Sequence, residues 1–442
     1  MKIAIVLGTR PEIIKMAPII DEIIERKIEL VLIHTGQHYD KEMSDNFFKD
    51  LEIPSPHYNI NVGSGSHGKQ TGLMMEGIEE VLMDENPDIV LVQGDTNAVL
   101  AGALTASKLH IPVGHVEAGL RSFDLTMPEE INRKTCDACS LMYFVPTEQS
   151  AINLLAEDIS RKKLFITGNT VVDACFRHLQ IAEKRGIEDE TLKELDIYNM
   201  DNILTLTMHR AENVDDEDRL NNIINALGEL SEMNIIFPVH PRTKKNLEYF
   251  GVWDKLNEMD HVHIINPLGY FDFIVLTSHS TLILTDSGGL QEESITLDVP
   301  ALTLRYNTER PETVEAGGNI LVGSDTDVIV NNVNKILNDK EFSEKMKSAV
   351  NPYGDGKAAI KIIDAIEKYY KEGLLDIQLP DDIMPSFERK IGVVKENITV
   401  SGFEKKHNAL IHLVYDGEKM VFPEDKLNIK GKIVTYDQYE KL

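Results

Sequence analysis

The segment IAIVLGTRPEIIKMAPIIDEII, residues 3–24, determines the fold class of this chain. Its first six residues form an apolar run that ends at Gly8, which is typical of a buried strand followed by a tight turn. Apolar residues then recur at helical spacing, namely Ile13, Ile14, Met16, Ala17, Ile20, Ile23 and Ile24. A buried strand that leads directly into an amphipathic helix is the repeating unit of a parallel sheet covered by helices on both faces.

The same pattern occurs in two series along the chain. Apolar runs lie at 3–8, 30–36, 89–95, 112–118, 141–146 and 164–168, and a second series lies at 203–209, 234–240, 262–267, 281–287, 301–306 and 319–323. We therefore predict an α/β protein with two Rossmann-like, doubly wound parallel-sheet domains.

The predicted domains are residues 1–168 and 169–375, and a long helix at about 356–372 ends the second and crosses back to the first. Residues 376–442 differ in character, because an Asp-Gly turn at Asp416–Gly417 lies between alternating strands. We expect a small β-rich appendage there, and the sequence does not indicate its role.

Composition excludes several classes of protein. No uncharged apolar run approaches the roughly 20 residues that a membrane span requires, and the early glycine and charges argue against a signal peptide. A net charge of −28 disfavours binding to nucleic acid or to an anionic membrane. The chain has three cysteines, and the C-x-x-C of Cys136 and Cys139 lacks the second pair of a structural zinc site. We expect a cytoplasmic protein without a bound metal.

Polar residues of the first half follow the apolar runs, where ligands bind in open parallel sheets. Arg10 and Lys15 follow the first run and either bind an anion at a helix N-terminus or belong to a solvated helix start. Asp95 ends the third run and is either a partly buried general base or the cap of the next helix. Glu117 lies between an apolar strand and a glycine, which favours a functional role.

Two further patterns admit both a functional and a structural interpretation. Glu129 and Arg133 are four residues apart, so they form an ion pair either in a site or on the surface. His209 ends a strand and either contacts a diphosphate, transfers a proton or is structural.

The strongest local pattern is TDSGGLQEE at 285–293, where an apolar strand leads into a glycine-rich helix start. The hydroxyl of Ser287 and the N–H groups of Gly288 and Gly289 are suited to bind an anion. Glu293 lies about a turn and a half later, where it could accept hydrogen bonds from a ribose. The alternative is an ordinary glycine-rich connection with a helix cap. Arg310, in TERPE at 308–312, adds one more cation.

These motifs occur together in the order of a known family. They are GTRPE at 8–12 with Lys15, GQH at 36–38, GDT at 94–96, HVEAGLRS at 115–122, PEEINR at 128–133, HR at 209–210, TDSGGLQEE at 285–293 and TERPE at 308–312. Over about residues 1–370 the chain resembles the non-hydrolysing UDP-N-acetylglucosamine 2-epimerases. The resemblance implies a glycosyltransferase-B arrangement of the two domains. It also implies interconversion of UDP-GlcNAc and UDP-ManNAc without NAD or metal, usually by a homodimer.

The resemblance also implies a role for each candidate residue. Acid/base groups near C2 of the sugar would be Asp95, Glu117 and Glu129, with Arg133 orienting Glu129. Cations for the diphosphate would be Arg10, Lys15, His209 and Arg310. Ser287, Gly288 and Gly289 would bind phosphate, Glu293 the ribose, and Leu268 and Phe273 the uracil. The acids of the first domain would then act on a nucleotide held by the second.

Four other functions share parts of this pattern. A hydrolysing 2-epimerase would release free ManNAc and UDP, and a related epimerase would act on an oxidised or diacetamido UDP-sugar. A glycosyltransferase would share the Ser-Gly-Gly turn and the domain pair, but it would require an acceptor rather than three carboxylates around C2. A non-catalytic UDP-sugar sensor would keep its properties when the carboxylates are neutralised.

Overall fold

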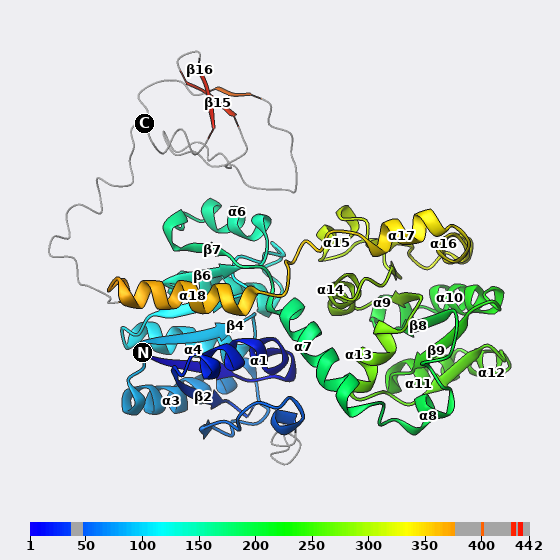
Figure 1. The fold of residues 1–442 in the computed structure, drawn as a ribbon, viewed down its shortest axis with the longest axis horizontal. Coiled ribbons are helices and arrows are strands. Elements are labelled where there is room, and N and C mark those ends of the chain that lie inside the picture. Colours follow the sequence, from blue (N-terminus) through cyan, green and yellow to red (C-terminus); the bar gives the residue numbers. More distant parts are fainter. Residues whose placement is uncertain (37–46, 376–398, 402–425, 430–431, 436–442) are drawn as a thin grey trace. The chain divides into compact units, whose positions relative to one another are not determined.

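The computed structural model describes residues 1–36, 47–375, 399–401, 426–429 and 432–435 (Figure 1). The chain divides into two compact units. Unit 1 comprises Met1–Asn169 together with the segment that begins at Ala359, and unit 2 comprises Thr170–Ala358. Each unit contains one parallel sheet, so the predicted α/β fold class with two doubly wound sheets is confirmed.

Unit 1 is built on a seven-stranded sheet with the order β3-β2-β1-β4-β5-β6-β7, in which every neighbouring pair is parallel. The strands are β1 (Lys2–Leu7), β2 (Glu29–His34), β3 (Tyr58–Asn59), β4 (Ile89–Gln93), β5 (Val113–Val116), β6 (Met142–Val145) and β7 (Leu164–Ile166). The apolar side chains of β1 from Ile3 to Leu7 are fully buried. Burial on both faces explains why this strand is continuously apolar rather than alternating.

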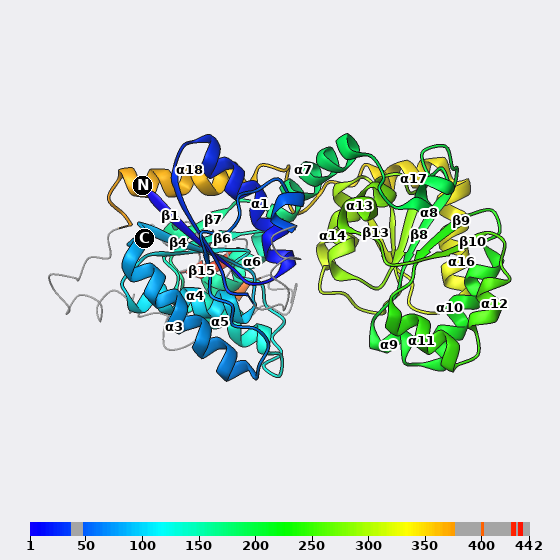
Figure 2. The same cartoon turned by 90° about the horizontal axis from the view of Figure 1, so that it is seen from below.

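The helices of unit 1 cover both faces of its sheet. They are α1 (Arg10–Glu25), α3 (His67–Glu85), α4 (Asn97–Lys108), α5 (Pro128–Cys139), α6 (Glu148–Ala156), the 3-10 turn η1 (Arg161–Lys163) and α18 (Ala358–Lys371). Figure 2 shows α3, α4 and α5 on one face of the sheet and α1 and α18 on the other. Tyr369 of α18 donates to the carbonyl of Lys162 at 2.6 Å, and Asp364 pairs with Arg26 at 2.7 Å.

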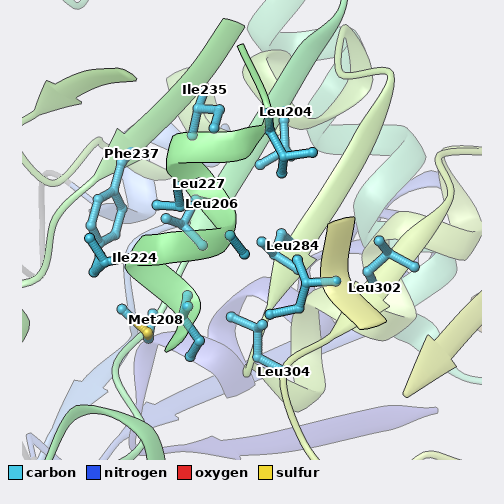
Figure 3. Close-up of a cluster of buried hydrophobic side chains, with 14 of the residues drawn as sticks. Leu204, Leu206, Met208, Ile224, Leu227, Ile235, Phe237, Leu284, Leu302 and Leu304 are labelled. Carbon is cyan, nitrogen blue, oxygen red and sulfur yellow. The ribbon is translucent and has the colours of Figure 1, made fainter. Parts of the chain in front are cut away.

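Unit 2 is built on a six-stranded parallel sheet with the order β10-β9-β8-β11-β12-β13. The strands are β8 (Ile203–Thr207), β9 (Asn234–Pro238), β10 (Val262–Ile265), β11 (Leu282–Thr285), β12 (Ala301–Thr303) and β13 (Asn319–Leu321). The main core packs the sheet against its helices, and its members include Leu204, Leu206, Ile224, Phe237 and Leu284 (Figure 3).

The helices of unit 2 connect these strands. They are α7 (Thr170–Arg185), α8 (Glu190–Glu194), α9 (Ala211–Val214), α10 (Glu217–Glu229), α11 (Pro241–Tyr249), α12 (Trp253–Asn257), α13 (Tyr270–Ser278), α14 (Gly288–Thr296), α15 (Pro311–Glu315), α16 (Thr326–Asn338) and α17 (Lys340–Lys347). Among the described residues, no helix has both the length and the apolar character that a bilayer crossing demands.

Each sheet has one point where its strand order changes direction. The chain proceeds from β1 to β2 and β3 on one side, and from β4 to β5, β6 and β7 on the other. In unit 2 the same change of direction falls between β8 and β11. Open parallel sheets bind ligands beyond the carboxyl ends of the strands at such points. The loops after β1, β4, β8 and β11 are therefore the first places to look for a site.

All twelve predicted strands are present, and the structure adds the two-residue strand β3 (Tyr58–Asn59). The predictions extend one to three residues beyond the observed strand ends, because the last residues of each motif turn away from the sheet. Strands β14 (Thr399–Ser401), β15 (Lys426–Ile429) and β16 (Lys432–Thr435) form an antiparallel sheet in the predicted appendage. The turn predicted at Asp416–Gly417 lies outside the described residues.

Candidate active site

Glu12 occupies the change of strand direction in unit 1. It lies in the first turn of α1, is 2% exposed, and accepts hydrogen bonds from Gly8 N at 2.6 Å and Thr9 Oγ1 at 2.9 Å. Burial raises the pKa of Glu12 to about 7, and hydrogen bonds from Thr96, Gly8 and Thr9 oppose that rise. The Thr96 contact connects the loop after β1 to the loop after β4. The sequence pattern assigns Glu12 no role, and only its place in GTRPE at 8–12 distinguishes it from other glutamates.

Asp95 follows β4 and does not cap the next helix. Thr96 caps α4, because its side chain accepts from Ala98 N at 3.2 Å. Asp95 Oδ2 instead accepts from Arg133 Nη1 at 2.5 Å. Burial raises the pKa of Asp95 and so does the charge of Glu117, whereas Arg133 and Lys15 lower it. The capping alternative is therefore excluded, and the Asp95 carboxyl group contacts Arg133 instead.

Glu117 lies directly after β5 in a strained backbone conformation. Its φ is +69°, in the left-handed region that non-glycine residues seldom adopt. The side chain is buried, and its oxygens accept from Lys15 Nζ at 2.9 and 2.8 Å, from Asn169 Nδ2 at 3.2 Å and from Gln93 Nε2. Four N–H···O contacts of this kind suit a charged carboxylate. Strain of this type is concentrated at functional positions.

The predicted ion pair between Glu129 and Arg133 is wrong. Arg133 instead contacts Asp95 and the buried Glu130, whose Oε2 lies 2.8 Å from Arg133 Nη2. Backbone N–H groups of Ser122 and Phe123 also donate to Glu130, at 2.9 and 3.2 Å. Burial would raise the pKa of Glu130, but the hydrogen bonds from Ser122 and the charge and hydrogen bond of Arg133 lower it.

Glu129 itself is exposed in the first turn of α5. Residues three and four apart both share a helix face, so spacing alone could not distinguish Glu130 from Glu129 as the partner of Arg133.

Asp286 organises the corresponding point of unit 2. It is fully buried after β11 and accepts from the backbone N–H groups of His209 at 3.0 and 3.1 Å and of Arg210 at 2.9 Å. Asn213 Nδ2 lies at 3.3 Å, and His209 Nδ1 lies 3.2 Å from Asp286 Oδ1. Burial would raise the pKa of Asp286, but the contacts of His209 and Arg210 lower it. One carboxylate therefore fixes the loop that carries His209.

The N-terminus of α14 follows Asp286 directly. Ser287 is the N-cap residue, and its side chain makes no capping hydrogen bond. A Cβ atom added at Gly288 would lie 3.6 Å from Glu309 Oε2 and 4.0 Å from Arg210 Nη2, so the ion pair of these two side chains lies beside this helix end. The first helical N–H groups and the Ser287 hydroxyl are the donors that a helix N-terminus can offer to an anion.

The other predicted binding residues lie in varied environments. Arg310 Nε pairs with the buried Glu292 at 2.7 Å, and Glu293 is half-buried on the same helix, α14. Leu268 and Phe273 are half-buried and pack against two different apolar clusters. Arg10 is exposed, and its guanidinium lies 5.2 Å from the centroid of the Phe47 ring.

The structure thus brings together two sets of the predicted residues, one in each unit. Lys15, Asp95, Glu117 and Arg133 form the set of unit 1, and His209, Ser287, Gly288 and Gly289 form the set of unit 2. Most of the GQH motif at 36–38 lies outside the described residues. Among the side chains that the structure describes, no cluster of His, Cys, Asp or Glu could hold a metal ion.

Two doubly wound sheets, with carboxyl groups after the strands of one and a helix N-terminus beside the change of strand direction of the other, place the chain in the nucleotide-binding α/β class. The family model of UDP-N-acetylglucosamine 2-epimerase matches residues 21–367. The UDP-N-acetylglucosamine 2-epimerase of Methanocaldococcus jannaschii is 51% identical over 368 residues, which cover 82% of this chain and 98% of that protein. This chain therefore belongs to the UDP-N-acetylglucosamine 2-epimerase family.

Two more comparisons bear on ligand and substrate. The crystal structure of the M. jannaschii enzyme in complex with UDP-GlcNAc and UDP has a TM-score of 0.68 at 50% identity, and the match covers 83% of this chain and all of that one. The UDP-2,3-diacetamido-2,3-dideoxy-D-glucuronate 2-epimerase of Pseudomonas aeruginosa is 40% identical over 374 residues, which cover 83% of this chain and 100% of that protein.

Proposed function

We propose that this protein is an isomerase that interconverts UDP-GlcNAc and UDP-ManNAc without hydrolysing them. The observation that supports this function most directly is the carboxylate pair of unit 1, in which Asp95 and Glu117 influence each other electrostatically at the change of strand direction. Their surroundings differ, since Glu117 receives N–H groups and a lysine while burial raises the pKa of Asp95. Two carboxyl groups in unequal environments are suited to act as base and acid.

Elimination and re-addition explain why acid/base groups suffice. No carbonyl adjoins C2 in the sugar ring, so a simple carbanion at C2 would be too costly. Removing the C2 proton while the anomeric C–O bond breaks releases UDP and leaves 2-acetamidoglucal. Delivering a proton to the opposite face of C2 as UDP adds back to C1 inverts the centre and returns a UDP-sugar. Each half-reaction transfers one proton between C2 and a positioned side chain, and we assign this task to Asp95, Glu117 and Glu129.

The nucleotide contacts are assigned mainly to unit 2. Ser287, Gly288 and Gly289 would bind phosphate at the N-terminus of α14, with His209 beside them. Glu293 would bind the ribose, and Leu268 and Phe273 the uracil. Arg10, Lys15 and Arg310 would stabilise the departing diphosphate. Lys15 and Arg310 each contact a carboxylate already, so this role requires them to share their N–H groups.

The remaining parts of the proposal concern the state of the protein. We propose that it works in the cytoplasm as a homodimer. We also propose that it needs neither NAD nor a metal, because the elimination route moves only protons and UDP.

A second candidate is a 2-epimerase of a modified UDP-sugar. The relative from P. aeruginosa that acts on a diacetamido glucuronate favours it, although its identity of 40% is lower than the 51% of the M. jannaschii enzyme. Parallel assays with UDP-GlcNAc and with the diacetamido uronate decide between the two substrates by the ratio of their kcat/KM values.

The decisive experiment incubates the protein with UDP-GlcNAc in D2O. Deuterium at C2 of both UDP-GlcNAc and UDP-ManNAc supports elimination and re-addition. Accumulation of free ManNAc and UDP would instead identify a hydrolysing 2-epimerase. Absence of exchange combined with transfer of GlcNAc to an added acceptor would identify a glycosyltransferase.

A further inference from the structure

A buried charged cluster lies next to the carboxylates of unit 1 and has received no role so far. His115 belongs to β5 and is fully buried, and its Nδ1 lies 2.6 Å from Asp137 Oδ1 on α5. Asp137 Oδ2 lies 2.7 Å from Arg121 Nη2 and accepts from Gly119 N at 3.3 Å. The second ring nitrogen of His115, Nε2, lies 2.9 Å from the carbonyl oxygen of Gly94.

The partners of His115 determine its protonation state. A carbonyl oxygen can only accept a hydrogen bond, so Nε2 must carry a proton. The Asp137 carboxylate accepts from arginine and from a backbone N–H, so Nδ1 carries a proton as well. Burial lowers the pKa of His115, but its contacts with Cys136 and Asp137 raise that pKa well above the ordinary value. Burial likewise opposes the charge of Asp137, while His115 and Arg121 hold its pKa low. The pair is imidazolium and carboxylate.

The Gly94 carbonyl is a sensitive place for such a bond. It belongs to the peptide that joins Gly94 to Asp95, and Gly94 has a φ of +83°. On the other side of Asp95, Asn132 Nδ2 donates to the Asp95 carbonyl at 2.9 Å. His115 belongs to β5 and is two residues before Glu117, which directly follows that strand. One imidazolium therefore links the peptide before Asp95 to the strand that directly precedes Glu117.

We propose that His115 is a positioning residue that sets the placement of Asp95 relative to Glu117, by donating its Nε2 proton to the Gly94 carbonyl. This inference rests on the proposed epimerase function. The ring does not contact the substrate in this proposal and transfers no proton. Its effect is to keep two reacting carboxyl groups at one spacing, and misplacement by about 1 Å at a reacting group can cost on the order of 10²-fold in rate.

Two substitutions distinguish the hydrogen bond made by Nε2 of His115 from the one made by Nδ1. The amide of His115→Gln reaches the position of Nε2 and can still donate to Gly94, whereas the amide of His115→Asn reaches the position of Nδ1 and can contact only Asp137. Both variants remove the imidazolium, so both lose the ion pair to Asp137. We expect kcat to fall on the order of 10²-fold in His115→Asn and by about tenfold or less in His115→Gln, which keeps the hydrogen bond. KM for UDP-GlcNAc should change little in either variant.

Equal losses of kcat at equal melting temperature, or better activity in His115→Asn, would overturn the proposal. Nitrogen-15 NMR of histidine-labelled wild-type protein adds a readout that needs no variant to fold. A proton on Nε2 of His115 between pH 6 and 8 supports the proposal, and a ring without a proton on Nε2 contradicts it. If the wild type itself shows no C2 exchange in D2O, the proposed function fails, and the NMR result still tests the imidazolium by itself.

Discussion

Each unit has a buried carboxyl group beside the change of strand direction of its sheet, but the pKa values of these two groups are shifted in opposite directions. Glu12 follows β1 in unit 1, and Asp286 follows β11 in unit 2. Burial dominates at Glu12 and raises its pKa to about 7. At Asp286 the hydrogen bonds and charge of His209, with the N–H of Arg210, outweigh burial and lower the pKa.

The difference follows from the donors that each carboxyl group meets. Glu12 accepts from backbone N–H and hydroxyl groups, and no cation is among the causes that shift its pKa. Asp286 accepts from two successive backbone N–H groups and from the ring of His209. Asp286 is thus a fixed negative charge that organises a basic loop suited to bind phosphate. Glu12 in unit 1, whose pKa is raised to about 7, can instead exchange a proton near neutral pH.

The largest expected effect is a loss of kcat when a proposed catalytic carboxylate of unit 1 is neutralised, with little change in the affinity for UDP. Glu117→Gln should lower kcat for epimerisation by about 10³-fold, because it removes a proton-transfer group. The dissociation constant for UDP should stay within about threefold, since the proposed UDP contacts lie mainly in unit 2. Turnover is followed by proton NMR of the UDP-sugars, and UDP binding by calorimetry.

Glu85→Gln is the matched control for that substitution. Glu85 is in the same unit and pairs with Lys2 and Tyr58 on the side of α3, so its loss should leave turnover unchanged. Unchanged turnover in Glu117→Gln would remove the acid/base role from the proposal and would favour a UDP-sugar sensor.

Asp286→Asn tests whether the buried carboxylate of unit 2 fixes the loop that carries His209. The amide cannot accept from all the donors around Asp286, and a lost hydrogen bond to a buried charge costs about 2 kcal/mol in unfolding free energy. We expect the affinity for UDP to fall about tenfold, equivalent to about 1.4 kcal/mol, because the loop that carries His209 is no longer fixed. Calorimetry and urea unfolding measure the two effects.

The free energy of unfolding of the wild type and of Asp286→Asn should also differ in its dependence on pH. The pKa of Asp286 is lower in the folded protein than in the unfolded chain. Asp286 therefore contributes its full stabilisation at pH values above the unfolded-state pKa, and this contribution is lost as the pH falls through the folded-state pKa. The stability gap between wild type and variant should therefore shrink on acidification. Asp254→Asn, an exposed site in α12 of the same unit, should show neither change. A gap that widens in acid would contradict the assignment.

The same two units show how far sequence patterns reach. All twelve predicted strands were correct because apolar runs buried on both faces of a sheet are conspicuous. Asp95, Glu117 and the Ser287–Gly289 turn were found because they follow those strands. The partner of Arg133 was predicted wrongly, since Glu129 and Glu130 both lie within one helical turn of it.

The roles of Glu12, His115 and Asp286 were not predicted for a different reason. Each depends on partners distant in sequence or on burial, such as the pairing of His115 with Asp137 and Gly94 or of Asp286 with His209. A motif shows that such a residue is present, but only the packed structure shows which donors surround it.

Glu12→Gln tests the raised pKa of Glu12 through the pH dependence of the free energy of unfolding. A folded pKa raised from 4.5 to about 7 means that the folded protein binds a proton that the unfolded chain has released. Glu12 therefore stabilises the fold below about pH 4.5, and this contribution falls as the pH rises to about 7, by about 3 kcal/mol in total. The glutamine variant lacks this titration. Urea unfolding of both proteins at several pH values between 4.5 and 8 should show the wild type losing that amount relative to the variant, and parallel curves would contradict it.

The smallest expected effect compares one turn glycine from each unit. Gly119 in unit 1 has a φ of +80°, and an added Cβ would lie 2.3 Å from the carbonyl oxygen of Ser150. Gly186 in unit 2 has a φ of +72°, with nothing within 4 Å of an added Cβ. Alanine at Gly186 should cost only the left-handed conformation, about 1 kcal/mol. Alanine at Gly119 should cost about 2 kcal/mol more, because the backbone of α6 must move. Equal losses of unfolding free energy in the two variants would mean that the backbone of the turn around Gly119 adjusts to the added Cβ at little cost. The close packing of that turn would then not be what holds Glu117 in its left-handed conformation.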